Sequence, residues 1–326
     1  MSSLNPKLNY YSPPDKKNWN QRVSKNVNQP LFWHEKIKLS HKKLIRDNSN
    51  YRKCVGILGY VCDEGVRRNS GRVGAVNGPK EIRKQLGKLA FHLKTKLIID
   101  FGDVTCPNKE MEGCQKAFSE ISKELIRKNC FTIGLGGGHD LSYGHFMGIK
   151  KAFSNKKIGI INFDAHFDLR KPSDKGNSGT PFYQILNKWE KSVKYLVLGI
   201  QKSANSRILY NTASKLGVSY IPVEDFNFQN EKKVLSIIES FIKTCDLLYV
   251  SVDLDGFTSS IAPGVSAPSP FGFSISFFKS IFEHIFKSKK VIAMDIVELN
   301  PKYDYDSSTA KLSAQIIDLA CKINPA

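Results

Sequence analysis

The chain has 326 residues, with 49 Lys or Arg against 30 Asp or Glu and a formal net charge of +19. A hydrophobic content of 41% is typical of a globular protein with a large core. No segment approaches the roughly 20 apolar residues of a membrane span, and the polar start lacks a signal-peptide core. These features exclude a membrane protein and favour a cytoplasmic one.

The positive charge is spread along the chain. Residues 1–53 carry twelve Lys or Arg and three Asp or Glu, but neither they nor the rest contain a dense basic run or zinc-finger spacing. We therefore predict a lysine-rich solvated surface, with no nucleic-acid partner and no membrane partner.

Short apolar runs alternate with helical patterns along most of the chain. The predicted strands are residues 55–60, 97–101, 131–135, 158–163, 195–199, 218–222, 247–252 and 291–296. The clearest predicted helices are residues 79–93, 110–128, 231–243, 274–287 and 307–322. This alternation favours a single α/β domain with a parallel sheet covered on both faces. We expect residues 1–50 to form an N-terminal arm packed on a main domain of residues 51–326.

Two histidines and four aspartates directly follow three of the predicted strands. They are His139 in GGGHD, Asp164, His166 and Asp168 in DAHFD, and Asp253 and Asp255 in SVDLD. Alternate side chains of an extended segment share a face, and ligands of parallel sheets bind at the carboxyl ends of the strands. Any one of these residues alone is more often structural, but the set together predicts a site for two divalent metal ions.

The composition of this set indicates the kind of metal. Carboxylates dominate and no thiol takes part, which favours Mn²⁺ over Zn²⁺. Two such ions about 3.5–4 Å apart can share a water molecule and lower its pKa towards neutrality. The seven cysteines lie outside the motifs, and we expect them to be reduced and mostly buried.

The three motifs, in this order, resemble the ureohydrolase superfamily, which includes arginase, agmatinase and formimidoylglutamase. The resemblance runs from about residue 19 to the C-terminus. It implies a three-layer α/β/α fold with an eight-stranded parallel sheet, a binuclear manganese centre and a homo-oligomer. It also implies one ion held by His139, Asp164, Asp168 and Asp253, and a second held by Asp164, His166, Asp253 and Asp255.

The sequences that flank these motifs narrow the resemblance to formimidoylglutamase. The segments that carry it are residues 67–75 with Gly78 and Pro79, residues 167–170, residues 178–182 and residues 262–268. Arginase and agmatinase have a histidine in the loop after the DAH strand, whereas Phe182 takes that place here. No histidine lies between His166 and His284.

The resemblance implies hydrolysis of N-formimidoyl-L-glutamate to L-glutamate and formamide, a step of histidine degradation. Asp168 is then the candidate for proton transfer to the leaving amine, and Glu298 for holding the amidine, because a carboxylate can accept from two N–H groups. The two carboxylates of the substrate require cationic or hydrogen-bonding partners. The candidates for binding the substrate are Arg170, Arg72, Ser178, Thr180 and Asn69.

Three alternatives stay open at this point. One is another ureohydrolase that releases urea from guanidinobutyrate, arginine or agmatine. A second is a non-catalytic basic protein that keeps the metal site for stability, and a third is an amide hydrolase of deacetylase type with a single zinc. The product of the reaction and the number of bound metal ions distinguish them.

Overall fold

The computed structural model describes residues 8–19, 31–40, 54–93 and 96–324. Its centre is one ten-stranded sheet in the order β1-β4-β3-β5-β10-β9-β6-β7-β8, with β2 paired to β4 beside β1. The strands are β1 (Tyr11–Ser12), β2 (Lys38–Leu39), β3 (Cys54–Val61), β4 (Leu97–Thr105), β5 (Cys130–Leu135), β6 (Ile158–Phe163), β7 (Val193–Ile200), β8 (Ser219–Pro222), β9 (Leu247–Asp253) and β10 (Val291–Val297).

The strands from β3 to β10 are the eight that the sequence predicts, and all of them run parallel. The predicted α/β fold with an eight-stranded parallel sheet is thereby confirmed. The two short strands β1 and β2 extend it at the edge of β4, one antiparallel and one parallel. The central strands β5 and β6 are buried along their whole length, as expected of strands covered on both faces.

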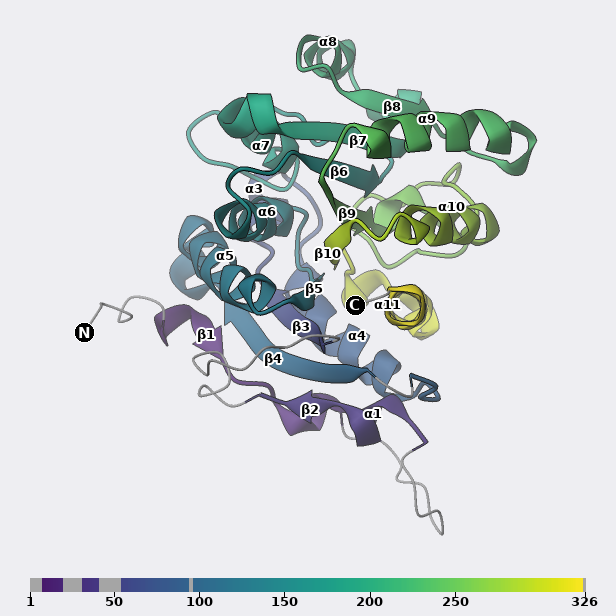
Figure 1. Ribbon diagram of the computed structural model, residues 1–326. Helices are drawn as coiled ribbons and strands as arrows, with labels where there is room; N and C mark the ends of the chain where they lie inside the picture. The colour runs from purple at the N-terminus through teal and green to yellow at the C-terminus, as the bar shows by residue number, and fades with distance from the viewer. Residues whose placement is uncertain (1–7, 20–30, 41–53, 94–95, 325–326) are drawn as a thin grey trace.

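Helices cover both faces of the sheet (Figure 1). They are α1 (Trp33–Lys36), α3 (Glu64–Arg68), α4 (Gly78–Gly87), α5 (Met111–Arg127), α6 (Leu141–Ala152), α7 (Pro181–Trp189), α8 (Arg207–Lys215), α9 (Glu231–Lys243), α10 (Ile275–Lys287) and α11 (Ser308–Ile323). Apolar side chains of α4, α9, α10 and α11 form one core with the sheet, whereas those of α5 to α8 pack on the opposite face. The result is the predicted three-layer arrangement.

One helix ends earlier in the structure than the sequence predicts. The sequence predicts a helix over residues 79–93, but α4 ends at Gly87. Glycine is a frequent terminator of helices because it loses more backbone entropy in them than other residues do. The apolar residues that follow, Leu89 and Phe91, still pack against the core, which is why the helical pattern continues past the helix.

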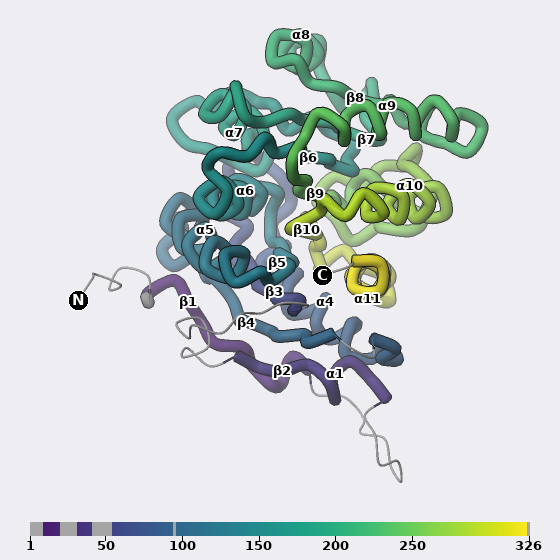
Figure 2. Tube along the Cα trace, viewed as in Figure 1, coloured from purple at the N-terminus to yellow at the C-terminus, as the bar shows by residue number. Residues whose placement is uncertain are grey.

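The described parts of the N-terminal segment lie along β4 (Figure 2). The indole of Trp19 donates to Asp100 of β4 at 2.8 Å, and the indole of Trp33 donates to Asp318 of α11 at 3.0 Å. A boundary near residue 50 lies outside the described residues, so the division into an arm and a main domain stays a prediction. Among the described helices, none is long and apolar enough to cross a membrane.

Candidate metal centre

Four neighbouring strands at the middle of the sheet bring the predicted site residues together. The strands β5, β10, β9 and β6 lie side by side in that order. His139 follows β5, Asp164 follows β6, Asp253 is the last residue of β9, and Glu298 follows β10. Because parallel strands end at the same edge, these side chains meet although up to 159 residues separate them in sequence.

The first group of candidate ligands surrounds His139. Its Nδ1 atom lies 2.9 Å from a carboxylate oxygen of Asp168, 2.9 Å from one of Asp253 and 3.3 Å from one of Asp164. These four residues offer ligand atoms that lie within 4.8 Å of one another. The imidazole is almost completely buried, so the group can hold an ion away from bulk solvent.

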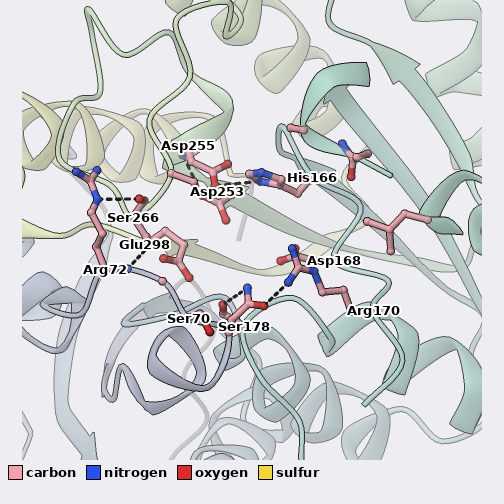
Figure 3. A pocket seen from close by; sticks show the side chains of 16 residues that line it. Ser70, Arg72, His166, Asp168, Arg170, Ser178, Asp253, Asp255, Ser266 and Glu298 are labelled. Carbon is pink, nitrogen blue, oxygen red and sulfur yellow. Dashed lines mark hydrogen bonds and ion pairs between the residues drawn. The ribbon is translucent and has the colours of Figure 1, made fainter. Parts of the chain in front are cut away.

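The second group surrounds His166. Its Nδ1 atom lies 3.1 Å from Asp255 and 3.5 Å from the other carboxylate oxygen of Asp164. Asp164 thus faces both histidines, one with each oxygen. Asp253 belongs to the first compact group, and the second consists of Asp164, His166 and Asp255. In Figure 3, His166, Asp253 and Asp255 lie close together in the pocket.

The electrostatics of the two groups fit a cation. Although Nδ1 of His139 lies 2.9 Å from two carboxylate oxygens, neither contact has the geometry of a hydrogen bond, and the buried Oδ1 of Asp255 also has no hydrogen-bond partner among the described residues. Burial, with repulsion from Asp255 and Asp164, raises the pKa of Asp253 well above its ordinary value. Burial also opposes ionisation of Asp164, but contacts with His139 and His166 outweigh it and lower its pKa. A divalent ion would supply the partner that these atoms lack and would offset the repulsion.

The glycines before His139 allow close approach of the backbone. A Cβ atom on Gly137 would lie 1.7 Å from the carbonyl oxygen of Cys62. The amide of Gly138 donates to that carbonyl at 3.1 Å, and the amide of Gly137 donates to Tyr60 at 2.9 Å. The loop is therefore held against the end of β3, and this fixes the position of His139.

The sequence did not predict the polar network that lies behind His139. Nε2 of His139 lies 3.0 Å from the hydroxyl of Ser251, which donates to the fully buried Asp295 at 2.5 Å. Ser142 and Tyr249 also donate to Asp295. Such partners orient an imidazole and fix which nitrogen faces a metal. The available signal was Ser251 two residues before Asp253, on the same face of β9.

Asp168 and Glu298 share a backbone conformation that is uncommon outside glycine. Their φ angles are +49° and +68°. Glu298 accepts a hydrogen bond from the backbone amide of His139 at 2.8 Å, and its own amide donates to Gly137. Burial raises the pKa of Glu298 to about 8. Such strained residues concentrate at functional sites, where the surrounding structure holds them in place.

A cavity of about 310 Å³ opens over both groups. His166, Asp168, Asp253, Asp255 and Glu298 line its floor, and two arginines border it at opposite sides (Figure 3). This volume is at the lower end of the range for small-molecule sites. The predicted metal and catalytic residues therefore reach the same cavity, apart from His139 and Asp164, which lie beneath it.

Arg170, Asn69 and Ser178 form a hydrogen-bonded chain along the wall of the cavity. The guanidinium of Arg170 donates to Asn69 at 2.7 Å, and the amide nitrogen of Asn69 donates to Ser178 at 3.1 Å. Arg170 is exposed, whereas Ser178 is buried. These three of the five predicted substrate-binding residues thus lie side by side in the structure.

Arg72 and Thr180 have other partners. The guanidinium of Arg72 donates to the carbonyls of Ser266 and Val265 at 2.8 and 2.5 Å and stacks on Tyr303 at 4.0 Å. Arg72 lines the cavity, but these contacts commit it to holding the loop at residues 265–266. Thr180 is fully buried and is not among the residues that line the cavity, because its hydroxyl bonds to Asn177 and Gln184 at the start of α7.

Phe182 lies close to the candidate centre but beneath it. Its ring packs edge-on against the imidazole of His139, with centroids 5.1 Å apart, and stacks on Tyr195. The side chain is fully buried and does not line the cavity. Phe182 therefore supports His139 from the side of α7.

The chain is similar to known proteins over most of its length. The Arginase family profile matches residues 53–321. The formimidoylglutamase of Geobacillus sp. (strain WCH70) is 38% identical over 307 residues, which cover 93% of this chain and 94% of the relative. That of Chromobacterium violaceum is 37% identical over 306 residues, which cover 93% of this chain and 96% of the relative.

Solved structures agree with these sequence matches. The Trypanosoma cruzi formiminoglutamase with Mn²⁺ has a TM-score of 0.75 at 25% identity, covering 87% of this chain and 98% of that one. The Bacillus subtilis formimidoylglutamase has a TM-score of 0.76 at 23% identity, covering 85% and 88%, and supports the fold. The predicted resemblance is confirmed, and with it the prediction of a hydrolase of amidine C–N bonds. The chain belongs to the Arginase family.

Proposed function

We propose that this protein is a formimidoylglutamase with two Mn²⁺ ions, which hydrolyses N-formimidoyl-L-glutamate to L-glutamate and formamide in histidine degradation. The observation that carries the proposal is the convergence of two His–Asp groups with Arg170, Asn69 and Ser178 on one cavity. Relatives that carry this name at 33–38% identity support it, as does the Mn²⁺ in the Trypanosoma cruzi structure.

The residues that would hold the ions are the six that the sequence singles out. His139 and Asp168 would hold one ion, His166 and Asp255 would hold the other, and Asp164 faces both histidines. Asp253 lies against His139, and we assign it as the second shared ligand. Two ions bound there would lower the pKa of a shared water molecule and so supply a nucleophile at neutral pH.

Glu298 is placed to bind the amidine end of the substrate. It lines the cavity beside Asp168 and Asp255, and the backbone amide of His139 fixes one of its oxygens. An amidinium brings a positive charge, which would favour the ionised carboxylate over the protonated form that burial favours. Asp168, at the floor of the same cavity, is our candidate for delivering a proton to the leaving amine.

Arg170 is placed to bind the carboxylate end. It is exposed at the cavity wall, and its hydrogen bond to Asn69 orients the guanidinium. Charge-assisted pairs of guanidinium and carboxylate are among the stronger hydrogen bonds in proteins. Asn69 and Ser178 complete this wall, whereas Arg72 and Thr180 act as positioning residues because of the contacts they make to the loops.

The identity of the product tests the proposal. Protein reconstituted with Mn²⁺ is incubated separately with N-formimidoyl-L-glutamate, arginine, agmatine and guanidinobutyrate. We expect glutamate and formamide from the first substrate and no urea from the others. Urea from any of the other three would keep the family and the fold but assign a different substrate.

Replacing Arg170 tests the carboxylate wall. The change Arg170→Met should raise the KM for N-formimidoyl-L-glutamate by roughly 10–100-fold, the cost of a lost charged hydrogen bond, with the bound Mn²⁺ unchanged. Arg127→Met removes an exposed arginine of α5 and serves as the control. An unchanged KM in Arg170→Met would remove Arg170 from the substrate site.

A further inference from the structure

Three cysteines outside the candidate metal centre converge at one point. Cys62 follows β3, Cys106 follows β4 and Cys114 lies in the first turns of α5. Their sulfur atoms all lie within 4.8 Å of one another. None of them contributes to the His–Asp groups, so the proposed function leaves them unexplained.

The pairing of β3 and β4 explains why the first two thiols meet. The last paired residues of these strands are Val61 and Thr105, so Cys62 and Cys106 are the next residues on both chains. The helix α5 packs against β3 and β4 and returns Cys114 to the same edge (Figure 1). Cys62 and Cys114 are almost fully buried, and Cys106 is partly exposed.

The three sulfurs lie close enough together to bind one ion. A zinc ion binds thiolates at about 2.3 Å in a tetrahedral arrangement, which sets neighbouring sulfurs roughly 3.8 Å apart. The partial exposure of Cys106 leaves one side from which a water molecule could serve as the fourth ligand.

The surroundings favour an added positive charge. The hydrogen bond with the thiol of Cys106, together with burial, raises the pKa of Cys62 to about 12, whereas hydrogen bonds with Cys114 and Cys62 lower the pKa of Cys106 to about 4. The other two thiols therefore favour ionisation of Cys106, and the thiolate is the form of cysteine that binds metal. The nearby carboxylate of Asp140 is buried, and its Oδ1 atom has no hydrogen-bond partner among the described residues.

We propose that Cys62, Cys106 and Cys114 form a second metal site, which binds one thiophilic d10 cation of the zinc class. Binding would release to solvent the protons that the three thiols carry and give three thiolates around a dication. Harder ions such as Mn²⁺ prefer oxygen ligands, so the two sites of the chain would select different metals.

A metal ion bound by the three cysteines would stabilise the loop that carries His139 in the proposed catalytic centre. The carbonyl of Cys62 accepts the hydrogen bond from Gly138, directly before His139. Tyr60, two residues earlier, donates to Asp140 at 2.6 Å, directly after His139. An ion that ties the ends of β3 and β4 to α5 therefore also braces the loop that carries His139.

Cadmium titration tests this site in the intact protein. The protein is first saturated with Mn²⁺ to occupy the His–Asp groups and is then titrated with Cd²⁺. Binding to cysteines gives a thiolate-to-cadmium charge-transfer band in the ultraviolet, which His and Asp ligands do not give. We expect the band to saturate at one equivalent, to disappear with excess Zn²⁺ and to be lost in Cys106→Ser.

The control variant is Cys130→Ala, which removes a thiol from the other close pair, with its sulfur 3.4 Å from that of Cys54. This variant should keep the full band. No saturating band in the wild-type protein would overturn the proposal, whatever the folding of the variants, and so would a band that survives in Cys106→Ser. Neither result depends on hydrolytic activity, so the test is separate from that of the proposed function.

Discussion

Two clusters of aspartates in one sheet differ in the cations that face them. At β4, Asp100 and Asp103 receive the side chain of Arg83, which is 1% exposed. Arg83 donates to both oxygens of Asp100 at 2.9 Å and to Asp103 at 2.7 Å. Trp19 adds a fourth hydrogen bond to this cluster. The chain itself therefore supplies the cation of this cluster.

At the ends of β6 and β9, no lysine or arginine among the described residues forms an ion pair with the aspartates. Four aspartates meet two imidazoles, and two buried polar atoms, on His139 and Asp255, lack a hydrogen-bond partner among the described residues. Buried charges are stable only when they are paired. The β4 cluster is structural, whereas the central cluster fits the divalent ions that we propose.

The largest expected effect follows from changing the central cluster. The change Asp253→Asn should lower hydrolytic activity by roughly three orders of magnitude or more, because it removes a shared ligand of ions that activate water. The metal-free variant should unfold at the same or a higher temperature than the wild type, because one repelling charge is gone. Activity assays and thermal unfolding with chelator measure the two effects. Asp246→Asn, an exposed aspartate just before β9, is the control, and retained activity in Asp253→Asn would contradict our assignment.

Changing the β4 cluster should lower stability and leave activity unchanged, the opposite of the effect expected for the central cluster. Asp100→Asn leaves Arg83 buried with one partner less, and should lower the free energy of unfolding by about 3–5 kcal/mol. The activity per folded molecule should stay unchanged. Denaturant unfolding gives the free energy, with Asp225→Asn as the control because its ion pair with Lys233 is exposed. If Asp100→Asn is as stable as the wild type, the contact between Arg83 and Asp100 does not stabilise the fold as we claim.

The smallest of these effects concerns the network behind His139. Ser251→Ala removes the hydroxyl that faces Nε2 of His139, and should weaken Mn²⁺ binding by about 10–100-fold. Activity should recover at saturating Mn²⁺. Ser313→Ala removes another buried serine hydroxyl, on α11, and provides the comparison. Equal Mn²⁺ affinity in the two variants would show that Ser251 does not orient the imidazole.

The sequence predicts much of this arrangement for a physical reason. Ligands at i and i+2 after apolar strands, such as Asp164 with His166, are visible as local patterns, and parallel strands bring them to one edge. The eight strands are predictable because their continuous apolar runs reflect burial on both faces.

Features that depend on contacts between distant segments could not be predicted from the sequence. The commitment of Arg72 to the carbonyls at residues 265–266 depends on how two loops meet. The convergence of Cys106 with Cys114 and Cys62 depends on the register of β3 with β4 and on the packing of α5. Neither leaves a periodic signal in the sequence, since each residue alone looks like an ordinary loop or core residue.

The central claim is that the cluster at the ends of β5, β6 and β9 holds two divalent ions close together. Electron paramagnetic resonance of the Mn²⁺-loaded protein, combined with elemental analysis, measures this directly. We predict two Mn²⁺ per chain with the spectrum of an exchange-coupled pair, and loss of that coupling in Asp253→Asn. A single uncoupled Mn²⁺ per chain, or none, would contradict the account.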